Sequence, residues 1–175
     1  MLQHKIKTGI RDVPDFPKPG ILFKDITPIL HNPVLCDEIV TVFSQYCADK
    51  NIHAIVGVES RGFLFGFALA NKLKIPFILV RKAGKLPYKT ISYEYDLEYG
   101  SAKVEMQVDD IKPGWNVLIH DDLLATGGTA EAAAKLIQMQ NGIVAGFAFV
   151  VELDFLKGKE RLIQYSENII SLVNY

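Results

Sequence analysis

The sequence predicts an α/β fold in which a central, mostly parallel sheet is flanked by helices. Short runs of β-branched residues alternate with stretches whose apolar residues recur every three or four positions, which is the helical period. One run, Asn116 to His120, carries apolar residues without alternation, as expected for a strand covered on both faces. Ligands of such folds bind at the carboxyl ends of the strands. The search for a site therefore starts at those ends.

The expected elements follow one another without a shift in composition. The first is an arm at 13–33, where five of the eight prolines predict an ordered but irregular segment. Helices are expected at 34–50, 63–72 and 128–140, strands at 52–58, 76–81, 116–120 and 143–153, and a polar ribbon at 91–99 and 102–108. We therefore expect a single domain over 1–175, with an N-terminal hood at about 1–33 and a flexible lid at about 84–106.

Charge and composition exclude several classes of protein. The 175 residues are 49% hydrophobic, and 19 Lys and Arg against 20 Asp and Glu give a net charge of −1. A chain without a positive field does not hold nucleic acid or a membrane surface through its overall charge. Neither a signal peptide nor a run approaching the ~20 apolar residues of a membrane span is recognisable, and Cys36 and Cys47 lack disulfide or zinc spacing. We expect a cytoplasmic protein that holds anions locally.

The segment after the strand 116–120 has the composition of a phosphate-binding loop. Leu123 to Thr129 reads LLATGGT. Its glycines let the backbone approach a ligand, its threonines supply hydroxyl donors, and the helix that follows begins with unpaired N–H groups. Each charge-assisted hydrogen bond contributes about 1.5 to 3 kcal/mol, so these donors can hold a monophosphate without a lysine. The motifs GxxxxGK[ST] and GxGxxG are absent, which argues against P-loop and dinucleotide-binding proteins.

Two carboxylates, Asp121 and Asp122, stand directly before this loop. They would repel a phosphate that they faced, so we expect them to accept hydrogen bonds from sugar hydroxyls nearby. A phosphate beside a vicinal diol describes a ribose 5-phosphate. A solvated strand end followed by an ordinary turn is the alternative, but both features together at the end of a buried strand favour a site.

The segment Val117 to Thr129, VLIHDDLLATGGT, resembles the phosphoribosyl-pyrophosphate motif of the type I phosphoribosyltransferases. Further segments resemble, in order, those of the adenine-specific branch of that family, over about residues 13–162. They are PKPGILFKDITP (17–28), ESRGF (59–63), VRKAGKLP (80–87), YDLEYG (95–100) and VEL (151–153). The resemblance implies the type I phosphoribosyltransferase fold with its hood and lid. It also implies purine salvage, in which the ribose phosphate of phosphoribosyl pyrophosphate moves to N9 of adenine, giving AMP and pyrophosphate.

The resemblance also implies which residues form the site. Asp121 and Asp122 would lie by the ribose hydroxyls and the positive charge that develops at the anomeric carbon. Glu98 would be the acid or base at the purine ring, a role worth about 10²- to 10⁴-fold in rate. The residues implied at the 5-phosphate are Ala125, Thr126, Gly127, Gly128 and Thr129. Those implied at the pyrophosphate are Ser60, Arg61, Arg81, Lys82 and Lys85. Those implied at adenine are Leu22, Phe23, Lys24, Arg61 and Leu153.

The implied cofactor is Mg²⁺, which as a hard ion keeps waters and binds substrate oxygens, so no dedicated protein metal site is expected. The implied assembly is a homodimer. Two alternatives stay open. A 6-oxopurine or xanthine phosphoribosyltransferase would share the loop but place a donor opposite the purine O6. A non-catalytic sensor of phosphoribosyl pyrophosphate would need a basic face or an added DNA-binding domain.

Two residues depart from the family's pattern. His120 stands where the family usually has an aliphatic residue. It is either a neutral histidine packed at the strand end or a modulator of the neighbouring carboxylates. Tyr88 follows Leu86-Pro87 where many relatives have a basic or small residue, which leaves open how the lid meets the pyrophosphate.

Overall fold

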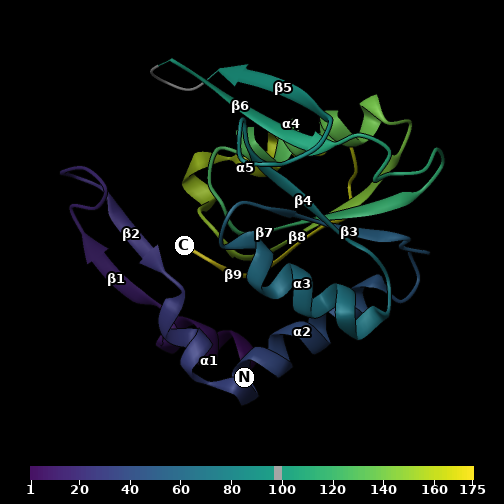
Figure 1. The fold of residues 1–175 in the computed structure, drawn as a ribbon. Helices are drawn as coiled ribbons and strands as arrows, with labels where there is room; N and C mark the ends of the chain where they lie inside the picture. The colour runs from purple at the N-terminus through teal and green to yellow at the C-terminus, as the bar shows by residue number, and fades with distance from the viewer. Residues whose placement is uncertain (97–99) are drawn as a thin grey trace.

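The computed structural model describes residues 1–96 and 100–175 (Figure 1). Within these residues the centre of the molecule is a seven-stranded sheet in the order β5-β6-β4-β3-β7-β8-β9. Its strands are β3 (Ala54–Val58), β4 (Phe77–Lys82), β5 (Thr90–Asp96), β6 (Ser101–Gln107), β7 (Asn116–Leu124), β8 (Ile143–Glu152) and β9 (Ile169–Asn174). Neighbouring strands pair in parallel from β4 to β9, and β6 runs antiparallel to β4 and β5. The predicted α/β fold with a mostly parallel sheet is confirmed.

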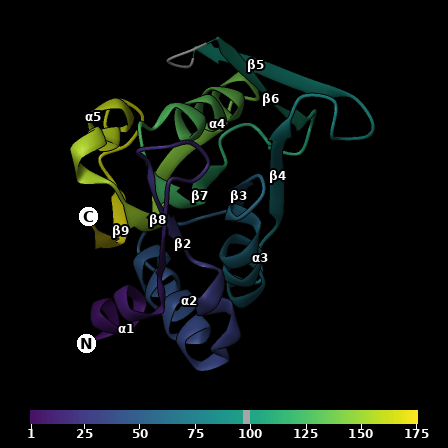
Figure 2. The same cartoon turned by 90° about the vertical axis from the view of Figure 1, so that its left-hand side faces the viewer.

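Helices cover both faces of the sheet (Figures 1 and 2). On one face lies α4 (Gly128–Met139), whose buried alanines allow close packing on β3, β7 and β8. On the other face lie α1 (Leu2–Gly9), α2 (Pro33–Cys47) and α3 (Gly62–Leu73). The short helices η1 (Thr27–His31), η2 (Asp154–Leu156) and α5 (Gly158–Leu162) connect longer elements. The sheet is thus buried on both sides, as the apolar run in β7 predicts.

The hood is a separate antiparallel hairpin of β1 (Arg11–Pro14) and β2 (Leu22–Asp25), which extends from the body at the left of Figure 1. Its attachment includes Lys24, whose side chain is only 10% exposed. The Lys24 ammonium lies 2.7 Å from the Asp12 carboxylate and 3.9 Å from the centroid of the Tyr175 ring. Because Tyr175 follows β9, this cation-π contact joins the hairpin to the central sheet.

Some elements differ from the sequence expectation. Helices α1 and α5 and strand β9 were not expected. Strand β7 continues to Leu124 rather than ending at His120, because Asp121 and Leu123 keep their parallel pairing with β8. The two carboxylates therefore lie within the paired strand, before its last two residues, rather than at its very end. No helix in the described ranges is long and apolar enough to cross a membrane.

Candidate active site

Three contiguous cavities lie at the carboxyl end of β7. The smallest, about 70 Å³, is formed by the turn from β7 into α4. The second, about 380 Å³, lies between that turn and the segment after β3. The third, about 290 Å³, lies between the hood hairpin and Arg61. Asp121 and Thr129 line the first two cavities and Arg61 lines the last two, so one ligand could extend through all three.

Backbone forms most of the first cavity. Gly127 has a φ of +82°, and a Cβ at this position would lie 2.8 Å from the carbonyl oxygen of Gly158, so only glycine fits without strain. Helix α4 begins at the next residue, Gly128. The first N–H groups of a helix lack intrahelical partners and carry partial positive charge. Together with the hydroxyls of Thr126 and Thr129, these N–H groups make the small cavity suitable for binding an anion.

An arginine and two carboxylates line the second cavity. Pairing of Gly57 with His120 brings the segment after β3 beside the end of β7. Arg61 donates from Nε to Asp122 Oδ2 at 2.5 Å, and the Asp122 side chain is 4% exposed. Desolvation and the neighbouring charge of Asp122 raise the pKa of Asp121 well above its ordinary value. The carboxylate pair therefore favours positive charge in the cavity beside it.

Two glutamates fix the cationic turn after β4. Arg81 donates to both oxygens of Glu59, at 3.3 and 3.2 Å, and to the carbonyl of Lys85 at 3.2 Å. Burial raises the pKa of Glu59, but the N–H of Lys82 and the Arg81 guanidinium outweigh burial and lower that pKa overall. Glu105 accepts from the N–H of Lys85 at 3.0 Å. These contacts fix the turn with Lys82 at the wall of the second cavity.

The third cavity is a mostly apolar slot. The rings of Phe16 and Phe23 pack edge to face with centroids 5.1 Å apart. The guanidinium carbon of Arg61 lies 5.1 Å from the Phe23 centroid. Asp25 lines the slot and accepts hydrogen bonds from Arg11 and from the N–H and hydroxyl of Thr27. Aromatic walls with polar groups at the edge suit a planar heterocycle.

Comparison with known proteins matches residues 25–165 to the phosphoribosyl transferase domain family. The chain is 51% identical over 175 residues to adenine phosphoribosyltransferase of Cytophaga hutchinsonii, covering 100% of this chain and 97% of that one. The crystal structure of adenine phosphoribosyltransferase from Thermoanaerobacter pseudethanolicus matches with a TM-score of 0.95 at 46% identity, over 99% of each chain. That of the Saccharomyces cerevisiae enzyme, complexed with an imino-altritol bisphosphate and adenine, matches with a TM-score of 0.92 at 41% identity, over 98% of each chain. The chain belongs to the adenine phosphoribosyltransferase family.

Most of the site residues predicted from the resemblance to this family line the three cavities. Those lining the first cavity are Ala125, Thr126, Gly127, Gly128 and Thr129. Those lining the second are Ser60, Arg61, Lys82, Asp121 and Asp122. Those lining the third are Phe23 and Arg61. The three cavities thus separate the residues predicted for the 5-phosphate, for the ribose with its pyrophosphate, and for the base.

Other predicted residues lie apart from the cavity walls. Arg81 is engaged with Glu59, as described above, and Lys85 is exposed. Leu22 is 50% exposed, Lys24 turns its ammonium toward Asp12 and Tyr175, and Leu153 packs against the apolar cluster on the α2 face. Glu98 lies outside the described residues. The roles assigned to these six residues, like the roles of the residues that line the cavities, stay predictions.

Sequence reasoning missed four residues of the slot. They are Val13, Phe16, Asp25 and Thr27. The available signal was the pairing of the hood hairpin, which sets Val13 opposite Phe23 and Arg11 opposite Asp25. The proline-rich composition of the arm hides this register, because prolines interrupt the alternation by which strands are recognised.

A larger open groove, about 780 Å³, lies beside this site between β5 and α5. Its charged lining mixes four carboxylates with two cations, namely Glu94, Asp96, Glu131 and Glu160 with Lys157 and Arg161. Such mixed charge does not favour an anion as strongly as the turn at 125–129 does. The groove shares Thr126 with the turn, but its mixed charge does not mark it as a phosphate site of its own.

His120 is fully buried directly before the carboxylates. Its ring packs edge-on against Phe43 with centroids 5.3 Å apart. Across residues 1–96 and 100–175, neither ring nitrogen has a hydrogen-bond partner. Burial lowers the pKa of His120 to about 4, although the charge of Asp122 acts in the opposite direction. The ring is therefore neutral near pH 7, which favours the interpretation of a packed neutral histidine.

We expect His120 to contribute to acid instability. Its pKa in the folded chain lies below the ordinary 6.5, so the unfolded chain takes up this proton first as the pH falls. The stability that the neutral, buried ring gives to the folded chain is therefore fully present above about pH 6.5. It falls by about 3 kcal/mol in all as the pH drops to 4 and below. Urea unfolding at pH 7 and pH 4.5 should show a larger loss of unfolding free energy in wild type than in His120→Leu, by about 2 kcal/mol. Equal losses in the two proteins would contradict this account.

Proposed function

We propose that this chain transfers the 5-phosphoribosyl group of phosphoribosyl pyrophosphate to N9 of adenine, giving AMP and pyrophosphate in purine salvage. The contiguity of the three cavities carries the proposal. An anion-binding turn, a cavity that combines carboxylates with cations, and a flat apolar slot follow one another. These match the phosphate, the ribose with its pyrophosphate, and the base. The yeast relative crystallised with adenine and a bisphosphate supports the same reading.

In this proposal the carboxylates act on the ribose and the cations bind the pyrophosphate. As N9 bonds to C1′, the bond from C1′ to the pyrophosphate oxygen breaks and positive charge develops on the ribose. Asp121 and Asp122, which line the second cavity, would stabilise that charge electrostatically. Ser60, Arg61 and Lys82 would hold the departing pyrophosphate, with Lys85 beside them. Arg81 would act there by fixing the turn through Glu59, or directly once that ion pair opens.

The hood supplies the base site in this proposal. Phe23 would stack on adenine, with Arg61 beside the Phe23 ring. The resemblance adds Leu153, which packs on the apolar cluster of the α2 face and does not line the slot. Leu22 and Lys24 would contribute main-chain groups, because the Lys24 side chain is already engaged with Asp12 and Tyr175. Adenine that bonds through N9 would carry its imidazole proton at N7, and the resemblance assigns acceptance of that proton to Glu98 as the N9–C1′ bond forms.

The donor set of the second cavity also fits Mg²⁺. Carboxylate oxygens of Asp121 and Asp122 suit a hard cation that takes its other ligands from water and substrate. Residues 1–96 and 100–175 contain no group of three His, Cys, Asp or Glu that could hold a metal, so pyrophosphate and ribose oxygens would be its main ligands. When bound, the ion would neutralise charge on the pyrophosphate.

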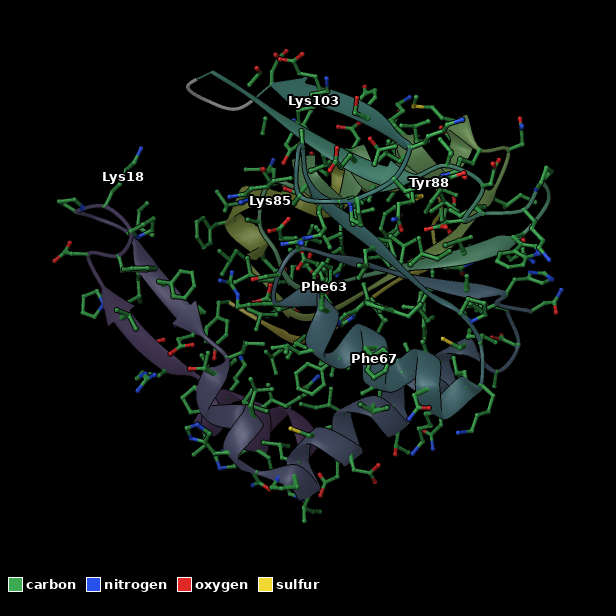
Figure 3. All side chains as sticks on the ribbon, viewed as in Figure 1. Lys18, Phe63, Phe67, Lys85, Tyr88 and Lys103 are labelled. Atoms are coloured by element: carbon green, nitrogen blue, oxygen red, sulfur yellow. The ribbon has the colours of Figure 1, made fainter. Side chains whose placement is uncertain are left out.

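We further propose a cytoplasmic homodimer. Along α3, Leu64 is 44% and Phe67 is 61% exposed, and the rings of Phe63 and Phe67 both pack on Phe77 (Figure 3). An exposed apolar row of this kind suits contact with a second copy of the chain. The free thiols of Cys36 and Cys47 are typical of a reducing compartment.

Adenine specificity separates this proposal from its alternatives. We expect AMP from phosphoribosyl pyrophosphate, Mg²⁺ and adenine, and no nucleotide from hypoxanthine, guanine or xanthine assayed in parallel by chromatography. Nucleotide from the oxopurines instead would favour a 6-oxopurine or xanthine enzyme. Binding of phosphoribosyl pyrophosphate without product from any base would favour the sensor.

A second prediction addresses Glu98. Glu98→Gln removes the group proposed to transfer a proton at the base, so kcat should fall by about 10²-fold or more while the dissociation constant of adenine changes little. Glu94→Gln, on the same ribbon, is the matched control and should keep kcat within about twofold of wild type. Turnover of Glu98→Gln close to wild type would sink the assignment.

A further inference from the structure

A single tyrosine connects the β5–β6 ribbon to the turn at 125–129. The hydroxyl of Tyr95, on β5, lies 3.1 Å from Thr129 Oγ1, in the first turn of α4, and either atom can be the donor. The ribbon lies over α4 in Figure 1, and β5 packs against that helix. Two segments 34 positions apart in sequence are therefore joined at the edge of the first cavity.

The position of Tyr95 is fixed by packing as well as by this hydrogen bond. Its ring packs against the apolar cluster on the α4 face of the sheet. Ring atoms Cδ2 and Cε2 lie 3.5 and 3.6 Å from the place that a Cβ on Gly128 would occupy. Packing of the ring thus holds the Tyr95 hydroxyl beside the Thr129 hydroxyl before any ligand binds.

The chemistry of two hydroxyls decides what the contact does when a phosphate binds. A threonine hydroxyl has one proton to donate and can accept at the same time. A phosphate dianion only accepts, so Thr129 must turn its proton toward the ligand. The hydrogen bond with Tyr95 can then persist only if Tyr95 donates and Thr129 accepts. Donation into Oγ1 also strengthens the hydrogen bond that Thr129 donates onward.

We propose that Tyr95 is a positioning residue for the 5-phosphate, which orients the Thr129 hydroxyl toward the ligand. The inference rests on the proposed function in one respect, namely that the turn at 125–129 holds the 5-phosphate. The inference adds that the β5–β6 ribbon takes part in phosphate recognition. A phosphate bound in the turn makes Tyr95, on β5, the donor of its hydrogen bond to Thr129.

Tyr95→Phe tests this role because it removes the hydroxyl and keeps the ring. We expect the dissociation constant of ribose 5-phosphate, measured by calorimetry, to rise about three- to tenfold, which is the range for loss of one hydrogen bond. The KM for phosphoribosyl pyrophosphate should rise similarly while kcat changes by less than about twofold, and the dissociation constant of pyrophosphate should not change. Tyr93→Phe is the matched control, since Tyr93 lies on the same strand and packs on the same cluster.

Thr129→Val separates failure of this inference from failure of the proposed function. Ribose 5-phosphate should bind more weakly to Thr129→Val, and adding Tyr95→Phe to that variant should have no further effect. Failure of wild type to bind ribose 5-phosphate would overturn the assignment of the turn itself, whereas unchanged binding to Thr129→Val would overturn the role of the Thr129 hydroxyl and with it that of Tyr95. Weaker binding to Thr129→Val with unchanged binding to Tyr95→Phe would overturn only the role of Tyr95. Independent effects of the two substitutions, or an equal loss in Tyr93→Phe, would also overturn that role.

Discussion

The close approach of two backbone segments, at Gly127 and Gly158, sets the geometry on which the rest of the site depends. Gly127 has a positive φ and no room for a Cβ, because the carbonyl of Gly158 lies where that atom would point. The chain can therefore leave β7, turn within three residues and begin α4 at Gly128. The helix start then faces the cavity beside Asp121 and Thr129. In the proposed reaction, a phosphate held there would bring its ribose to the carboxylates, so the turn would fix the register of the whole substrate.

A net charge of −1 conceals strong local charge in this molecule. Arg61 is paired with Asp122 and Arg81 with Glu59, and both pairs lie between the ends of parallel strands. Opposite charges thus stay close together and cancel at a distance, while in the proposed reaction each would face a different part of the substrate. Arg61 also lies over Phe23, so one side chain connects the second and third cavities. Global charge excludes a general polyanion binder, but it says nothing of such a site.

The sequence predicted the parts of this structure that repeat a local pattern. The alternation of strands and helices, the buried strand at 116–120 and the turn at 125–129 all follow from spacing and composition. Strand β9 was missed because its residues, IISLVN, are few and become a strand only by pairing with β8. Helix α1 was missed because it buries a single residue, Ile6. The prediction of the residues in the third cavity was incomplete for a similar reason, since Asp25 and its neighbours come together only through the register of the hood hairpin.

The measurement that tests most directly whether backbone geometry at Gly127 holds the phosphate is ribose 5-phosphate binding to two alanine variants. Gly127 and Gly114 have nearly the same φ, +82° and +81°, but a Cβ on Gly114 would meet nothing within 4 Å. Both variants carry similar backbone strain, and only Gly127→Ala disturbs the turn. We predict that Gly127→Ala weakens binding by at least about tenfold, equivalent to one charge-assisted hydrogen bond, while Gly114→Ala binds as wild type does. Equal affinities in the two variants would contradict the account.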